Sequence, residues 1–197
     1  NDNIIEGNGG ADVLDGGGGT DMVSFVNASG ADLTIDLAKQ TVSGPAADGA
    51  TIRNFESALG LFDGGTTFYG YPVGGDDIFY PNAAADHMSS DAIAYLVSYR
   101  YSPAGVTVDL VTGGPQSGGF AEGDVINIGS TQLDLEGSSF ADRLTGNGGV
   151  DMTGGAGDDV FGIGIGTNFI EDFTRGDDRI DVSSQGIVSF SQLQIST

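Results

Sequence analysis

The feature that most constrains this chain is a nine-residue spacing of glycine, aspartate and aliphatic residues near the N-terminus. Two consecutive segments, GNGGADVLD and GGGGTDMVS, place Asp12 and Asp21 in one position and Leu14 and Val23 two residues later. Another step of nine residues toward the N-terminus places Asn3 in the aspartate position. A fixed short period indicates a repeat protein, in which each unit buries its apolar residue only by stacking on the next unit.

The same pattern returns in the second half of the chain, in GSSFADRLT, GNGGVDMT and GGAGDDVFG. Asp142 and Asp159 hold the aspartate position in the first and third of these segments. The second segment aligns if one residue is lost after Asp151, which gives the aliphatic position to Met152. Between the two blocks, GGDDIFY around Asp77 keeps the order of glycine, acid and apolar residue, and the copies after it lack the glycines. We interpret the middle as an eroded continuation with few or no ion sites.

A longer duplication overlaps these repeats. VSFVNASGADLTIDL, which begins at Val23, resembles VSYRYSPAGVTVDL, which begins at Val97. Both alternate apolar and polar residues, as in LTIDL, where Leu33, Ile35 and Leu37 share one face. Alternation with a period of two predicts half-buried strands. Because no segment keeps a helical period, we expect an all-β chain with little helix.

Composition narrows the function classes. The chain has 6 Lys and Arg against 28 Asp and Glu, a net charge of −22, and no Cys. That charge repels nucleic acid and anionic membrane surfaces. No stretch is long and apolar enough for membrane insertion, and no thiolate metal site can form. The excess of carboxylates favours hard cations, which take oxygen ligands.

Calcium fits the repeat for a physical reason. Glycine-rich turns expose carbonyl oxygens and each turn adds one aspartate, so two neighbouring turns can supply the oxygens that Ca²⁺ takes. Without the ion the carboxylates repel each other, so we expect binding of several calcium ions to be coupled to folding. Magnesium fits less well because it demands octahedral geometry. The predicted metal ligands are Asp12, Asp21, Asp142, Asp151, Asp159, Asn3 and Asp77, with the turn residues Gly7, Gly9, Gly16, Gly18, Gly146, Gly148 and Gly154.

These segments resemble the RTX (repeats-in-toxin, hemolysin-type) family, whose nonapeptide GGxGxDxUx is a calcium-binding β-helix repeat. The segments VSY…GVTVDL and FIEDFTRGDDRIDVSS are similar to C-terminal regions of serralysin-like members. The resemblance implies a parallel β-roll, a solenoid with calcium in its turns, in a bacterial protein that folds after type I secretion. Asn3 in place of Asp and Phe140 in place of Gly predict weaker sites. The expected divisions are first repeats at 1–27, duplicated β segments at 28–136, a second repeat block at 137–165 and a terminal capping segment at 166–197.

We therefore expect a non-catalytic, extracellular or cell-surface calcium-binding module that is a structural part of a larger protein. Two alternatives stay open: recognition of a polysaccharide or surface partner through the aromatic residues of the middle segment, and self-assembly through open coil ends. His87 lies beside Asp86 and close to Ser89 in sequence. Members of a catalytic triad converge in space and are seldom sequence neighbours, so this cluster does not predict an enzyme.

Overall fold

The computed structural model describes residues 1–28, 32–47, 49–60, 65–69, 76–90, 94–128, 132–187 and 189. These residues form strands β1 to β19, three short 3₁₀ helices and no α-helix. The strands pair in parallel, apart from the antiparallel pair of β4 and β5. The prediction of an all-β chain with little helix is confirmed. The 3₁₀ helices are η1 (Pro45–Ala47), η2 (Gly119–Ala121) and η3 (Ser183–Gln185).

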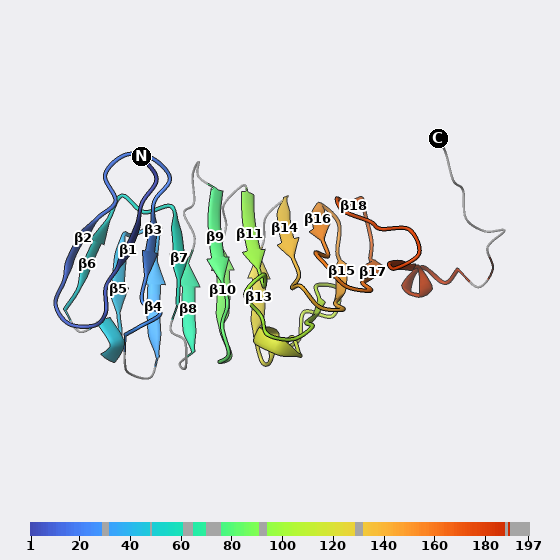
Figure 1. The fold of residues 1–197 in the computed structure, drawn as a ribbon, viewed down its shortest axis with the longest axis horizontal. Helices are drawn as coiled ribbons and strands as arrows, with labels where there is room; N and C mark the ends of the chain where they lie inside the picture. The colour runs from blue at the N-terminus through green and yellow to red at the C-terminus, as the bar shows by residue number, and fades with distance from the viewer. Residues whose placement is uncertain are drawn as a thin grey trace.

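One eight-stranded sheet runs through most of the chain, and its strands follow one another along the long axis of the molecule (Figure 1). Strands of both repeat blocks belong to it, so the two blocks share one stack. Its strands, in spatial order, are β1 (Ile4–Glu6), β3 (Met22–Ser24), β7 (Ser57–Leu59), β9 (Asp76–Tyr80), β11 (Ala94–Ser98), β14 (Leu133–Glu136), β16 (Val150–Thr153) and β18 (Asn168–Ile170).

Three smaller sheets hold the remaining strands. A two-stranded sheet pairs β2 (Val13–Asp15) with β6 (Thr51–Arg53). A five-stranded sheet contains, in spatial order, β13 (Val125–Ile128), β10 (His87–Ser90), β8 (Thr66–Tyr69), β4 (Leu33–Asp36) and β5 (Thr41–Ser43). A four-stranded sheet contains β12 (Thr107–Asp109), β15 (Arg143–Gly146), β17 (Val160–Ile163) and β19 (Arg179–Asp181).

A single apolar core joins the large sheet to the smaller ones. The chain alternates between the two sets of strands, so each strand places one or two side chains inward. Phe68 of β8 and Phe79 of β9 are fully buried, and their ring centroids lie 4.8 Å apart across the core. Buried side chains from both sets belong to one cluster. The large sheet and the smaller sheets therefore face each other across one shared core.

The two copies of the duplicated segment occupy equivalent places in this arrangement. In the first copy the chain leaves the large sheet after β3, starts a new small sheet with β4, completes the preceding one with β6 and returns at β7. In the second copy the same steps are made by β11, β12, β13 and β14. The layer of smaller sheets is therefore interrupted at each copy of the duplication.

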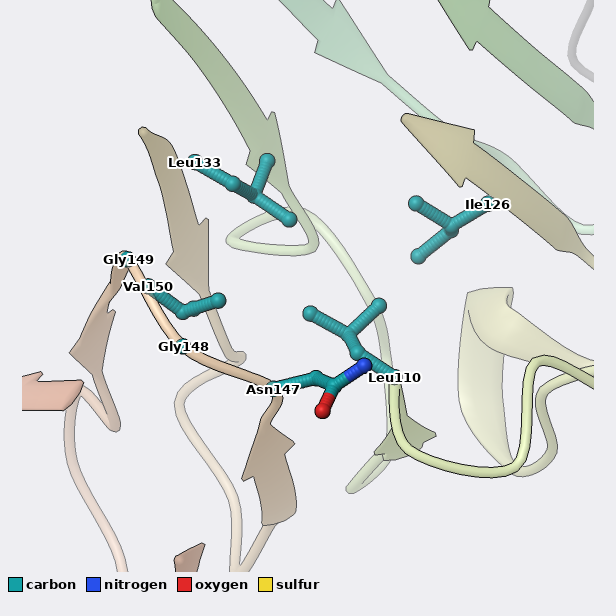
Figure 2. A pocket seen from close by; sticks show the side chains of 7 residues that line it. All are labelled: Leu110, Ile126, Leu133, Asn147, Gly148, Gly149 and Val150. Atoms are coloured by element: carbon teal, nitrogen blue, oxygen red, sulfur yellow. The ribbon is translucent and has the colours of Figure 1, made fainter. Parts of the chain in front are cut away.

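A small cavity of about 110 Å³ lies at the second interruption (Figure 2). Leu110, Ile126, Leu133 and Val150 extend toward a common space, and Asn147 lies beside Leu110. No charged side chain lines the cavity. It lies between the segments of β12 and β13, and its polar lining comes from Asn147, Gly148 and Gly149.

Candidate metal centre

Three of the predicted ligands are buried at the end of a turn, directly before a strand. Asp21 precedes β3, Asp142 precedes β15 and Asp159 precedes β17. The three residues are 0%, 3% and 1% exposed, respectively. Burial of an ionised carboxylate is costly unless hydrogen bonds or a cation compensate. The contacts of these carboxylates therefore show whether hydrogen bonds compensate the buried charge or whether a cation is needed.

The carboxylates form a ladder along the four-stranded sheet. Asp142 Oδ1 accepts the backbone N–H of Val106 at 2.6 Å, and Asp159 Oδ1 accepts that of Asp142 at 2.8 Å. Asp178 Oδ1 accepts the N–H of Asp159 at 3.0 Å. These four residues hold the same register position before β12, β15, β17 and β19. In this carboxylate ladder each aspartate caps the backbone of the preceding coil.

The second oxygen of a ladder aspartate bonds to its own turn. Asp142 Oδ2 accepts the backbone N–H of Ser138 at 2.6 Å. Asp178 Oδ2 accepts that of Thr174, also at 2.6 Å. In both cases the donor lies four residues before the aspartate. The carboxylate therefore ties the turn to the coil below it, which explains why an acidic residue recurs at this position.

Glycine is required beside these carboxylates. A Cβ atom on Gly154 would overlap Asp159 Oδ2, and a Cβ atom on Gly16 would lie 2.9 Å from Asp21 Oδ2. Gly9 has a φ of 84°, which L side chains rarely adopt. The glycines of the repeat therefore provide both the turn geometry and the space for the carboxylate.

The turn that ends at Asp21 has a carboxylate oxygen without a partner. Asp21 Oδ1 accepts the backbone N–H of Asn3 at 2.8 Å. Asp21 Oδ2 is buried and has no hydrogen-bond partner among the described residues, whereas the corresponding oxygens of Asp142 and Asp178 are bonded. The absence of a side chain at Gly16 leaves space beside it, because a Cβ atom there would lie 2.9 Å from this oxygen. A bound cation would supply the partner that this buried oxygen lacks.

Oxygens from two neighbouring segments converge beside Asp21. The side-chain nitrogen of Asn3 lies 2.9 Å from Asp21 Oδ1, 2.8 Å from the carbonyl oxygen of Asn1 and 3.5 Å from that of Gly16. This nitrogen has two hydrogens for three acceptors. A carboxylate with backbone carbonyls is the donor set that Ca²⁺ takes, and an asparagine can also present its oxygen. The residues of this turn therefore fit a calcium ion.

Electrostatics favour a cation at the ladder as well. Burial raises the pKa of Asp142, against the opposing effect of the N–H groups of Val106 and Ser138. Burial also raises the pKa of Asp159, and the negative charges of Asp142, Asp178 and Asp172 add to the effect. A divalent ion near these carboxylates would favour their ionised forms.

The middle of the chain continues the ladder without glycine-rich turns. Asp86 Oδ1 accepts the N–H of Thr66 at 2.6 Å, and Asp124 Oδ1 accepts that of Asp86 at 2.7 Å. The Tyr99 hydroxyl donates to Asp124 Oδ2 at 2.8 Å. Burial, followed by the charge of Asp124, raises the pKa of Asp86 to about 8. Burial raises the pKa of Asp124 to about 7.

The sequence pattern did not single out Asp124 and Tyr99, although a signal for Asp124 was present. DVI at Asp124 and DHM at Asp86 both place an apolar residue two positions after the acid, as the repeats do. The missing glycines concealed the match. An acid followed two positions later by an apolar residue therefore predicts a ladder aspartate better than the number of glycines before it does.

The structure differs from the sequence alignment at Asp151. In β16 the inward residues are Val150 and Met152, which are 4% and 0% exposed. Val150 therefore takes the position that the ladder aspartates hold, and Asp151 lies on the outer side of the sheet, in register with Asp134. A shift of one residue exchanges the two faces of a strand. The structure does not bring Asp151 together with the turn carboxylates.

The remaining predicted ligands lie in varied settings. Asp12 precedes β2 and is half-buried. Asp77 lies in β9, and its side chain falls outside the described part. Among the predicted turn glycines, Gly7 lies against the Phe25 ring and Gly148 has a φ of 78°. The Gly18 carbonyl accepts a hydrogen bond from the Asn1 ammonium group at 3.0 Å. The Gly146 carbonyl accepts one from the Gly164 N–H, also at 3.0 Å.

Within the described ranges, no three His, Asp or Glu side chains are grouped closely enough to hold a metal ion by themselves. A cation in a turn would therefore depend on backbone carbonyls as well as carboxylates. No helix in the described part of the chain is long and apolar enough to span a membrane. No known family profile matches the chain, and no curated protein matches its sequence.

Proposed function

We propose that this chain is a calcium-binding β-roll in which ions are held between successive turns by ladder aspartates and backbone carbonyls. The observation that carries the proposal is Asp21 Oδ2, a buried carboxylate oxygen without a partner among the described residues. The other oxygen of this carboxylate, Oδ1, lies 2.9 Å from the Asn3 side-chain nitrogen, which also contacts the carbonyl oxygens of Asn1 and Gly16. The donor set is all oxygen, which suits calcium better than a softer metal.

The path of the chain supports the roll. Successive strands alternate between the eight-stranded sheet and the smaller sheets, with parallel pairing along the stack. The turns thus recur at the edges of the stack, where each ladder aspartate contacts the coil before it. Repeated turns of one kind make repeated ion sites of one kind, so we propose several bound calcium ions.

Calcium binding would also stabilise the folded state of this chain. The chain carries a net charge of −22. Divalent ions would offset the repulsion among carboxylates and add binding free energy to folding. Weak sites suffice where calcium is plentiful, and extracellular modules work with Kd of about 10⁻⁴–10⁻³ M.

The resemblance to RTX repeats supports a setting for this chemistry. We propose a non-catalytic, secreted or surface module of a bacterial protein, which stays unfolded in low cytosolic calcium and folds after type I export. The module would be a structural part of a larger protein.

Crystals grown in calcium would test the site directly. Anomalous scattering is expected to show an ion in contact with Asp21 in the turn of residues 16–21, and further ions at the turns before Asp142 and Asp159. The same crystals soaked in magnesium are expected to lose those peaks. A calcium-grown crystal without an anomalous peak at any of these turns would overturn the proposal.

A further inference from the structure

The outer face of the five-stranded sheet carries an open hollow of about 350 Å³. Side chains of β8, β10 and β13 line it in two rows that cross the strands. Thr67, His87 and Val125 form one row, because His87 pairs with both of the others. Tyr69, Ser89 and Asn127 form the second row, in which Ser89 pairs with both of its neighbours.

The polar groups of this hollow are available to a ligand. In the described part of the chain, no hydrogen bond involves the side chains of Thr67, His87, Ser89 or Asn127. Strands β8 and β13 flank β10, so the groups of β8 and β13 lie on either side of those of β10. Neighbouring strands are about 4.8 Å apart, so these groups repeat at that interval across the sheet. A linear polymer with regularly spaced hydroxyl groups matches such a pattern.

Tyr69 gives the hollow an aromatic wall. Its side chain is 42% exposed, and it stands at the β8 edge of the second row. An exposed tyrosine offers an apolar ring face and a hydroxyl group at little cost in conformational entropy. Ring faces of this kind pack against the apolar faces of other ring compounds.

Charge selects the class of ligand. None of the residues lining this hollow is acidic, in a chain with 28 Asp and Glu. The outer face of the eight-stranded sheet is the opposite, because its hollow is lined by Asp134, Glu136, Asp151 and Glu171. A neutral hollow on a chain of net charge −22 attracts no polyanion and does not repel a neutral molecule.

We propose that this hollow binds a neutral polysaccharide, with the Tyr69 ring packed against a sugar and His87, Ser89 and Asn127 as hydrogen-bond partners. The proposal concerns a face of the sheet that is separate from the turns. It requires the folded chain and does not require an ion in any particular turn. A neutral polymer is favoured over a protein partner because the polar groups of the lining are regularly spaced in two rows and none is acidic, and Met88 and Val125 add apolar surface on which a sugar face can pack.

Affinity electrophoresis and calorimetry in calcium would test the proposal, with dextran, xyloglucan and galactomannan as neutral probes and alginate and polygalacturonate as acidic ones. We expect at least one neutral probe to bind and the acidic probes not to bind. Tyr69→Ala is expected to weaken binding at least 10-fold, whereas Tyr69→Phe, which keeps the ring, stays within about 3-fold.

Tyr101→Ala is the matched control, since Tyr101 is 63% exposed and packs on Tyr80 outside the hollow. This variant is expected to bind as the unaltered chain does. Circular dichroism of each variant separates loss of binding from loss of fold, and so from a failure of the calcium proposal. Absence of binding to all three neutral probes, stronger binding to the acidic probes, or equal losses in the Tyr69 and Tyr101 variants would each overturn the inference.

Discussion

Asp158 and Asp159 are adjacent residues with opposite surroundings. Asp158 is exposed, whereas Asp159 is 1% exposed and takes part in the carboxylate ladder. In Asp159→Asn the side-chain oxygen still accepts the N–H of Asp142, but the charge is lost. We expect calcium affinity to fall at least 10-fold, which is about 1.4 kcal/mol. The calcium-free chain should have at least as much strand structure as before, because repulsion from Asp172 and Asp178 is removed.

Calorimetric titration with calcium and far-UV circular dichroism in chelator would measure the two effects. The control is Asp158→Asn, which removes the same charge from an exposed position one residue away. It should change stability by no more than about 0.5 kcal/mol and leave calcium affinity nearly unchanged. Equal losses of affinity in the two variants would argue against the ladder as the ion site.

The buried pair of Asp86 and Asp124 predicts a pH dependence. Their pKa values are raised from 3.8 to about 8 and about 7. A carboxyl with a raised pKa in the folded state favours folding in its protonated form. Its contribution is complete below the unfolded pKa and is lost as pH rises through the folded pKa. In saturating calcium, where the chain is folded, these two groups should therefore lower the melting temperature as pH is raised from 5 to 9.

Asp124→Asn isolates this effect from general charge repulsion. The asparagine oxygen can accept the N–H of Asp86 while its nitrogen donates to Tyr99, so the contacts persist without a titrating group. The fall in melting temperature between pH 5 and 9 should be smaller in this variant and unchanged in Asp158→Asn. The interpretation fails if the Asp124 variant keeps the full slope at constant ionic strength.

At the scale of elements, the turn before β3 contains a glycine that the structure requires and one that it does not. A Cβ atom on Gly16 would overlap the carbonyl of Asn54 and lie 2.7 Å from the Asp21 Cβ, whereas one on Gly18 has nothing within 4 Å. Gly16→Ala should cost about 1–3 kcal/mol through overpacking. Gly18→Ala should be neutral or stabilise by about 0.4–1 kcal/mol. Denaturant titration distinguishes them, and similar costs would contradict this view of the turn.

The alternation of strand faces gives a second element-scale prediction. Phe161 of β17 is fully buried, and Phe169 of β18 is 55% exposed on the outer side. Phe161→Ala should cost about 3–5 kcal/mol, whereas Phe169→Ala should stay within about 0.5 kcal/mol. Denaturant unfolding in calcium measures both. If Phe161→Ala does not fold, Phe161→Leu provides a milder variant, and a cost at Phe169 equal to that at Phe161 would show that the facing of the strands is wrong.

At the scale of the whole molecule, the sequence predicted the class of fold better than the details of its register. The nine-residue period located Asp21, Asp142 and Asp159 at the residue before a strand, because each unit has a glycine-rich turn, one acid and one inward aliphatic residue. The period failed at Asp151, where two adjacent residues compete for the inward face and only packing decides. The sequence also gave no sign that the smaller sheets are interrupted at both copies of the duplication.

The first and last strands of the described part of the stack belong to the same scale. Ile180 in β19, which terminates the four-stranded sheet, is 51% exposed although it holds the inward position of its coil. At the other end, Ile5 of β1 and Leu14 of β2 are only partly buried. Edge strands with incompletely covered apolar residues can pair with further strands. Self-assembly through these ends stays a prediction from the sequence.

The central claim is that the carboxylates before the strands need divalent ions for the coils to stack. Far-UV circular dichroism during a calcium titration, started from the fully chelated chain, tests it most directly. We predict little strand signal in chelator and a cooperative gain of strand signal at calcium concentrations of about 10⁻⁴–10⁻³ M, with magnesium much less effective. A chain with the same strand signal and the same melting temperature in chelator and in excess calcium would contradict the account.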